Sequence, residues 1–129
     1  MGQPSAPSDL QRIVLVVSED SALRGALEFL LRVEGFSVRG VGSGEALRAA
    51  PLPGSISCLI VDHHSRGPAS GLAAVQAIRR RRAEVPIILI VAGPTRRLRA
   101  AAVEARCELV EKPPVGSVLI DALRRALQA

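Results

Sequence analysis

Three runs of aliphatic and β-branched residues limit the folds open to this chain more than any other feature. Residues 13–17 read Ile-Val-Leu-Val-Val, residues 58–61 read Cys-Leu-Ile-Val, and residues 87–91 read Ile-Ile-Leu-Ile-Val. Each run is apolar throughout, which is typical of strands that are buried on both faces of a parallel sheet. Such a sheet needs helices on both faces, so the sequence predicts an α/β protein.

Weaker strands and amphipathic helices complete the pattern. Residues 36–40 and 109–110 predict two further strands. The sequence predicts five helices between and after the strands, over residues 21–35, 43–50, 71–82, 95–106 and 115–127. Because strands and helices alternate along the chain, the predicted fold is a doubly wound parallel sheet with right-handed crossovers.

Several helix residues carry specific expectations. Ser21 is expected to cap the first helix, and Gly35 is expected to end it in a left-handed conformation. The last helix is expected to bury four aliphatic side chains, those of Val118, Leu119, Leu123 and Leu127. The arginines at 79–82 complement the negative end of their helix and are interpreted as solvated, with an anion-docking patch as the alternative.

Length and composition indicate one globular domain. The chain has 129 residues, of which 48% are hydrophobic and 22% are charged, a balance typical of a folded domain. Residues 1–10 are expected to form a disordered leader and residues 11–129 the domain. The sequence shows neither a membrane-spanning run nor a secretion signal, so a cytoplasmic protein without membrane contact is expected.

Charge and cysteine content narrow the classes of function. The net charge of +5 favours an acidic partner. Nucleic-acid binding by this domain alone is not expected, because neither Phe29 nor Phe36 lies in a basic cluster where it could stack on bases. Cys58 and Cys107 belong to no CxxC or Cys/His set, so they are interpreted as small buried residues rather than metal ligands.

Charged residues directly follow three of the predicted strands. Glu19 and Asp20 lie just beyond the first strand, Asp62 follows the third and Lys112 follows the fifth. Since the carboxyl ends of parallel strands lie at one edge of a sheet, these side chains are expected to meet there. Clustered carboxylates indicate a hard divalent ion such as Mg²⁺, and the lysine indicates a contact for a phosphate-like anion. The alternative for Glu19 and Asp20 is that they simply cap the first helix.

Four segments resemble the signature segments of response-regulator receiver domains, the CheY-like family. They are residues 13–20, 59–62, 86–91 and 111–113. The resemblance implies a flavodoxin-like fold, in which five helices cover a five-stranded sheet of order 2-1-3-4-5. It also implies a domain of a bacterial two-component phosphorelay that takes a phosphoryl group from a histidine kinase or phosphotransfer protein. Such a domain modifies itself and is not an enzyme that acts on an external substrate.

The resemblance implies roles for individual residues. Asp62 is the phosphoryl acceptor and Lys112 contacts the phosphoryl group. Mg²⁺ is the expected cofactor, held by Glu19, Asp62 and the backbone carbonyl of His64, with Asp20 as a further candidate. The peptide bond between Lys112 and the proline that follows it is expected to be cis.

Other residues depart from the pattern of the family. Ser18 replaces the first acid of the metal-binding pair and Glu19 is longer than the usual aspartate, so weak metal binding is expected. Val91 and Leu109 replace a switching hydroxyl and its aromatic partner, so the usual switch cannot operate. These departures keep a second hypothesis open, a pseudo-receiver that acts as an interaction or dimerisation module without phosphorylation.

Further features leave alternatives open. The loop at 63–70 is one residue longer than usual, and its histidines, His63 and His64, are interpreted as exposed, with a histidine metal site as the alternative. A homodimer through the fourth helix, fifth strand and fifth helix is one interpretation, and a monomer is the other. A flavin carrier shares the architecture, but the chain lacks Trp, Tyr and a Ser/Thr-rich phosphate loop.

Overall fold

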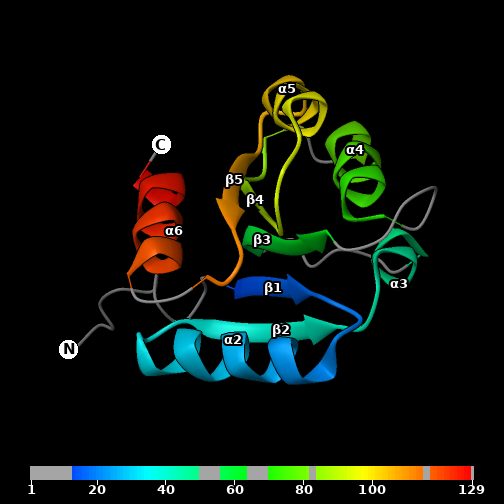
Figure 1. Ribbon diagram of the computed structural model, residues 1–129. Helices are drawn as coiled ribbons and strands as arrows, with labels where there is room; N and C mark the ends of the chain where they lie inside the picture. Colours follow the sequence, from blue (N-terminus) through cyan, green and yellow to red (C-terminus); the bar gives the residue numbers. More distant parts are fainter. Residues whose placement is uncertain (1–12, 50–55, 64–69, 82–83, 115–116, 129) are drawn as a thin grey trace.

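The computed structural model describes residues 13–49, 56–63, 70–81, 84–114 and 117–128, and the predicted leader at residues 1–10 lies outside them. The strands are β1 (Ile13–Val17), β2 (Ser37–Val41), β3 (Ile56–His63), β4 (Ile87–Val91) and β5 (Glu108–Glu111). The helices are α2 (Ser21–Val33), α3 (Gly44–Ala49), α4 (Gly71–Arg81), α5 (Arg96–Glu104) and α6 (Val118–Gln128). Strands and helices alternate, as the hydrophobic runs predict (Figure 1). Within the described ranges, no helix has the length and apolar character needed to cross a membrane.

All five strands pair in parallel in a single sheet, in the order β2-β1-β3-β4-β5. The predicted sheet and strand order are therefore confirmed. β3 lies at the centre, between β1 and β4 (Figure 1). The direction of winding reverses between β1 and β3, and open sheets of this kind bind ligands beyond the carboxyl ends of their strands at that point.

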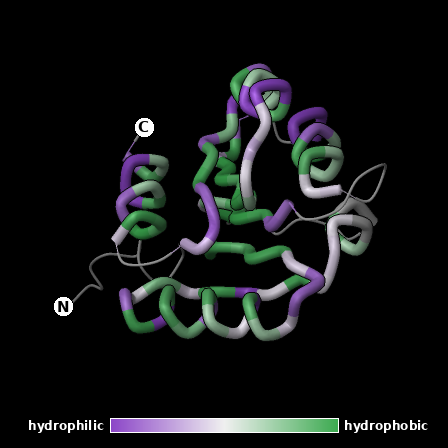
Figure 2. The backbone as a smooth tube through the Cα atoms, in the orientation of Figure 1, coloured by the Kyte–Doolittle hydropathy of each residue, from purple (hydrophilic) through white to green (hydrophobic). Residues whose placement is uncertain are grey.

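Hydrophobic layers cover both faces of the sheet. On one face α2 and α6 bury Leu31 and Leu123, and on the other face α3, α4 and α5 bury residues such as Ile78. Adjacent residues of one strand enter opposite layers, as Ile88 and Leu89 of β4 do. The central strands are therefore hydrophobic over most of their length, as the green tube in Figure 2 shows.

The central strand β3 extends beyond its apolar run. The sequence pattern suggested an end at Val61, but Asp62 is in register with Ile90, and His63 with Val91. Hydrogen bonding to β4 continues the strand after the hydrophobic pattern has ended. Asp62 is consequently held by the sheet itself.

Asp20, rather than Ser21, caps α2. The side chain of Asp20 accepts hydrogen bonds from the amides of Ala22 and Leu23, and Ser21 is already helical. The expected cap at Ser21 was therefore wrong, and the alternative role of Asp20 as a cap is confirmed. Gly35 has a φ of 96° and follows the helix as predicted.

The buried face of α6 begins one residue later than expected. Val118 is 55% exposed, so its predicted inward position was wrong. Leu119, Ile120 and Leu123 are buried, and Leu127 is partly buried against the same layer. Val118 is the first residue of the helix, and its position on the helix turns it to solvent.

Arg79 departs from the solvated interpretation of the arginine run. Its guanidinium donates hydrogen bonds to the carbonyls of Val85, Ala105 and Arg106. Burial, reinforced by the nearby charge of Arg106, lowers the pKa of Arg79. Arg79 therefore ties α4 to the ends of two neighbouring segments, whereas the next two arginines are exposed as predicted.

Candidate functional site

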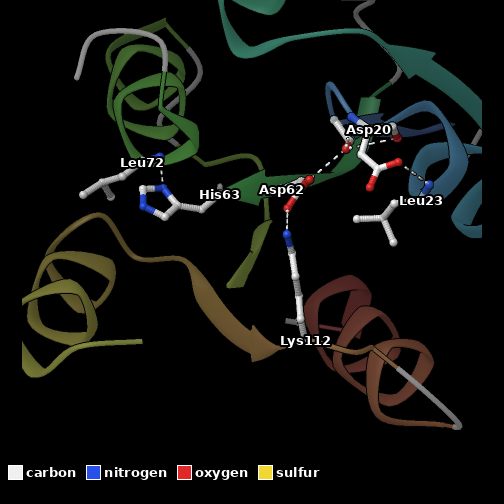
Figure 3. Close-up of polar contacts among 7 residues, drawn as sticks. Asp20, Leu23, Asp62, His63, Leu72 and Lys112 are labelled. Atoms are coloured by element: carbon white, nitrogen blue, oxygen red, sulfur yellow. Dashed lines mark hydrogen bonds and ion pairs between the residues drawn. The ribbon is translucent and has the colours of Figure 1, made fainter. Parts of the chain in front are cut away.

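Asp62 lies near the carboxyl end of the central strand β3 (Figure 3). The residue as a whole is only 6% exposed. A carboxylate buried to this extent is costly unless hydrogen bonds or an opposite charge compensate for the lost water. Both kinds of partner reach Asp62, from the ends of β5 and β1.

Lys112 supplies the opposite charge. Its Nζ lies 2.5 Å from Oδ1 of Asp62. Lys112 directly follows β5, and its amide donates to the carbonyl of Val91 at 2.9 Å, which continues the pairing of β4 with β5. The bond between Lys112 and Pro113 is cis, as expected. The structure thus brings together the aspartate and the lysine that the sequence singled out.

Ser18 supplies a hydrogen bond that the sequence did not predict. It is 2% exposed, and its Oγ donates to Oδ2 of Asp62 at 2.8 Å. The amide of Ser18 donates to the carbonyl of Val41, which extends the pairing of β1 with β2 and fixes the residue at the sheet edge. The sequence showed Ser18 only as a missing charge, although its position after a buried strand also allowed this contact.

The acids after β1 lie at the surface. Glu19 and Asp20 are exposed, and Oδ1 of Asp20 accepts hydrogen bonds from two amides of α2. His64, whose carbonyl was a predicted metal ligand, lies outside the described residues. Within the described ranges, no three His, Cys, Asp or Glu side chains are placed to hold a metal ion. The residues after β1 do offer oxygen donors, the type that Mg²⁺ prefers, with a hydroxyl at Ser18 in place of a carboxylate.

Comparison with known proteins identifies the family. Residues 14–124 match the response regulator receiver domain family. The chain belongs to this family. One relative is the C4-dicarboxylate transport transcriptional regulatory protein DctD of Pseudomonas aeruginosa, with 29% identity over 126 residues. The match covers 97% of this chain but only 27% of DctD.

Solved structures share the fold. FixJ-N is 28% identical, with a TM-score of 0.79, and the match covers 91% of this chain and 94% of FixJ-N. The response regulator TrrA of Thermotoga maritima, solved in complex with Mg²⁺ and BeF, is 24% identical with a TM-score of 0.77. That match covers 90% of this chain and 99% of TrrA. The TM-scores show that these structures share the overall fold of this chain.

In this receiver, the residues after β4 present no hydroxyl to Asp62 in any described contact. Val91 is 3% exposed and packs in the core. The hydroxyl of Thr95 instead accepts a hydrogen bond from the amide of Leu98 and caps α5. Leu109 of β5 packs partly buried against the same core layer. The side chains at both altered positions therefore stabilise the core.

The start of this receiver's α4 packs tightly against the end of β3. The amide of Leu72 donates to Nδ1 of His63 at 3.1 Å (Figure 3). A Cβ at Gly71 would lie 2.9 Å from the carbonyl oxygen of Asp62, so glycine permits this close approach. His63 is partly buried in β3, so its interpretation as an exposed loop residue was wrong.

The receiver's two cysteines do not serve the site. Cys58 and Cys107 are free and buried, in opposite hydrophobic layers. Burial raises the pKa of Cys58 to about 12 and also raises the pKa of Cys107. Both thiols therefore stay protonated near neutral pH and provide no nucleophile. Their interpretation as small buried residues is confirmed.

Proposed function

We propose that Asp62 is the phosphoryl acceptor of this receiver domain, and that its phosphorylation changes the interaction surface of the domain. The main support is the contact between the buried Asp62 and Lys112 at the edge where sheets of this kind bind ligands. Lysine is a common contact for phosphate groups. The proposed phosphoryl donor is a histidine kinase or phosphotransfer protein. A cytoplasmic location stays a prediction.

The proposed reaction is a transfer from histidine to aspartate. A carboxylate oxygen of Asp62 attacks the phosphorus of a phosphohistidine on the donor protein. The new P–O bond forms as the P–N bond breaks, and the ring nitrogen that held the phosphoryl group takes a proton from water, which leaves neutral imidazole and hydroxide. Lys112 neutralises charge on the transferred group, which is the main task of a protein in phosphoryl transfer. Asp62 is itself modified, so the domain does not turn over an external substrate.

Mg²⁺ is the proposed cofactor, and its proposed ligands are Glu19, Asp62 and the carbonyl of His64, with Asp20 as a further candidate. When bound, the ion supplies positive charge for the oxygens of the phosphoryl group. Support comes from the oxygen donors after β1 and from TrrA, which was solved with Mg²⁺ and BeF. Weak binding is proposed because Ser18 contributes no charge.

The test is phosphorylation by a small-molecule donor. Intact-mass spectrometry of the chain incubated with acetyl phosphate and Mg²⁺ is expected to show one added phosphoryl group. Asp62→Asn is expected to abolish the addition. Asp121→Asn, which changes an exposed acid of α6, is the control and is expected to leave it intact. An unmodified wild-type protein under these conditions would favour the pseudo-receiver alternative.

We also propose the surface of α5, β5 and α6 as the site of a homodimer. β5 is an edge strand of the sheet. Exposed ion pairs join it to both helices, Arg99 with Glu111 and Arg125 with Glu108. Such exposed pairs contribute little to the stability of one chain, so their charges are available for exchange with a second copy. A monomer is the alternative.

A further inference from the structure

The hydroxyl of Ser18 has two acceptors within reach. It lies 2.8 Å from Oδ2 of Asp62 and 3.4 Å from the carbonyl oxygen of Asp20. A hydroxyl carries a single proton, so it can donate a full hydrogen bond to only one of them at a time. The shorter contact, to a charged oxygen, is the stronger one in this structure.

The same hydroxyl is attached to the start of α2. The amide of Asp20 donates to Oγ of Ser18 at 3.0 Å. The carboxylate of Asp20 in turn accepts from the amide of Ala22 at 3.0 Å and caps the helix. It also accepts from the amide of Leu23 at 3.1 Å (Figure 3). A continuous series of hydrogen bonds therefore runs from Asp62 through Ser18 to the first turn of α2.

A second contact holds Ser18 against the helix. Nη1 of Arg24 donates to the carbonyl of Ser18 at 2.6 Å, and the amide of Arg24 donates to the carbonyl of Asp20. The backbone of Ser18 is thus anchored to the first turns of α2 independently of its hydroxyl. A rotation of the hydroxyl can therefore change the link to Asp62 while the backbone connection remains.

We propose that Ser18 couples the state of Asp62 to the first turn of α2. With Asp62 a free carboxylate, the hydroxyl donates to it. When esterification or substitution weakens that acceptor, the hydroxyl turns to the carbonyl of Asp20, and the β1–α2 connection loses this hydrogen bond to the central strand. Only the physiological trigger rests on the proposed phosphorylation, because the coupling itself belongs to the unmodified protein.

The test is a double-mutant cycle on the unmodified full chain, read by amide hydrogen exchange in NMR. Asp62→Ala removes the acceptor, and Ser18→Ala removes the link. In the protein that keeps Ser18, Asp62→Ala is expected to speed hydrogen exchange of the Ala22 and Leu23 amides about fivefold. This is the effect of losing one hydrogen bond of ordinary strength. In the Ser18→Ala background, the same change is expected to leave these amides unaltered.

Two further measurements separate coupling from general destabilisation. The amide of Leu98, capped by Thr95 at the start of α5, is expected to exchange at the same rate in all variants. Ser18→Thr, which keeps the hydroxyl, is expected to restore the response, and Asp62→Asn serves if Asp62→Ala does not fold. Equal responses in both Ser18 backgrounds, or no response in either, would overturn the proposal. Acetyl phosphate plays no part here, so the result is independent of the proposed phosphorylation.

Discussion

At the residue scale, Asp62 and Lys112 are the most closely coupled charged groups of the site. The side chain of Asp62 is 1% exposed and that of Lys112 is 23% exposed. Removal of one member of a buried ion pair leaves the other charge without compensation, and this costs more than the intact pair contributes. The side chains of the surface pair Arg99–Glu111 are 54% and 58% exposed, so water compensates the remaining charge and removal of one partner costs little.

Lys112→Met is therefore expected to lower the free energy of unfolding by about 2 to 3 kcal/mol, somewhat less than for a fully buried pair because the lysine is partly exposed. Arg99→Met is the matched control, and its loss is expected to stay below about 1 kcal/mol. Urea denaturation followed by circular dichroism measures both. Similar losses for the two variants would show that the pair at Asp62 behaves as a surface pair.

The raised pKa of Cys58 predicts that the stability of the protein depends on pH. Its pKa is about 12 in the folded protein against 9.0 for an ordinary thiol. The unfolded thiol therefore releases its proton at lower pH than the folded one, so the contribution is full below 9.0 and is lost as the pH rises toward about 12. The free energy of unfolding of wild type is expected to fall more steeply above 9.0 than that of Cys58→Ala. Parallel curves for the two proteins would contradict this assignment.

At the scale of elements, the start of α2 distinguishes two neighbouring residues. Asp20 caps the helix, whereas Ser21 is its first helical residue. Asp20→Ala is expected to lower the free energy of unfolding by about 1 kcal/mol, the usual value of an N-cap. Ser21→Ala is expected to change it little, since it removes no cap. Thermal or urea unfolding measures the difference. A greater loss of unfolding free energy for Ser21→Ala than for Asp20→Ala would show that Ser21 is the cap.

Two helix glycines, one in α4 and one in α2, are expected to respond in opposite ways to substitution by alanine. Gly71→Ala places a methyl group 2.9 Å from the carbonyl oxygen of Asp62, so α4 must move away from β3. Gly25→Ala meets no atom within 4 Å in the middle of α2, and alanine favours a helix over glycine by about 0.5 to 1 kcal/mol. Gly71→Ala is expected to destabilise the protein and Gly25→Ala to stabilise it. Melting temperatures that shift in the same direction would contradict the close packing of α4.

At the scale of the whole molecule, the proposed homodimer depends on charged pairs around the edge strand β5. Light scattering at increasing protein concentration is expected to show a dimer that Arg99→Glu weakens, because the substitution places like charges beside Glu111. Arg32→Glu, which changes an exposed arginine of α2, is the control and is expected to have no effect. A protein that stays monomeric at every concentration would contradict the proposed homodimer.

The main features of the fold could be predicted because they repeat along the chain. Apolar runs such as 87–91 remain hydrophobic whichever neighbour they pair with, so their pattern indicates buried parallel strands directly. The meeting of Asp62 with Lys112 followed from the same reasoning, because parallel strands bring their carboxyl ends to one edge.

The tertiary structure decided which distant groups became partners. The hydroxyl of Ser18 contacts Asp62, 44 positions away, and Arg79 binds carbonyls on segments up to 27 positions away. Neither contact produces a periodic pattern in the sequence. A side-chain hydrogen bond forms only when donor and acceptor are positioned to within a few tenths of an ångström, and the packing of the elements sets that position. The sequence by itself determined the strands and the edge where the charges gather, since these follow from periodicity. Only packing in three dimensions determined that a serine would share the buried aspartate with the lysine.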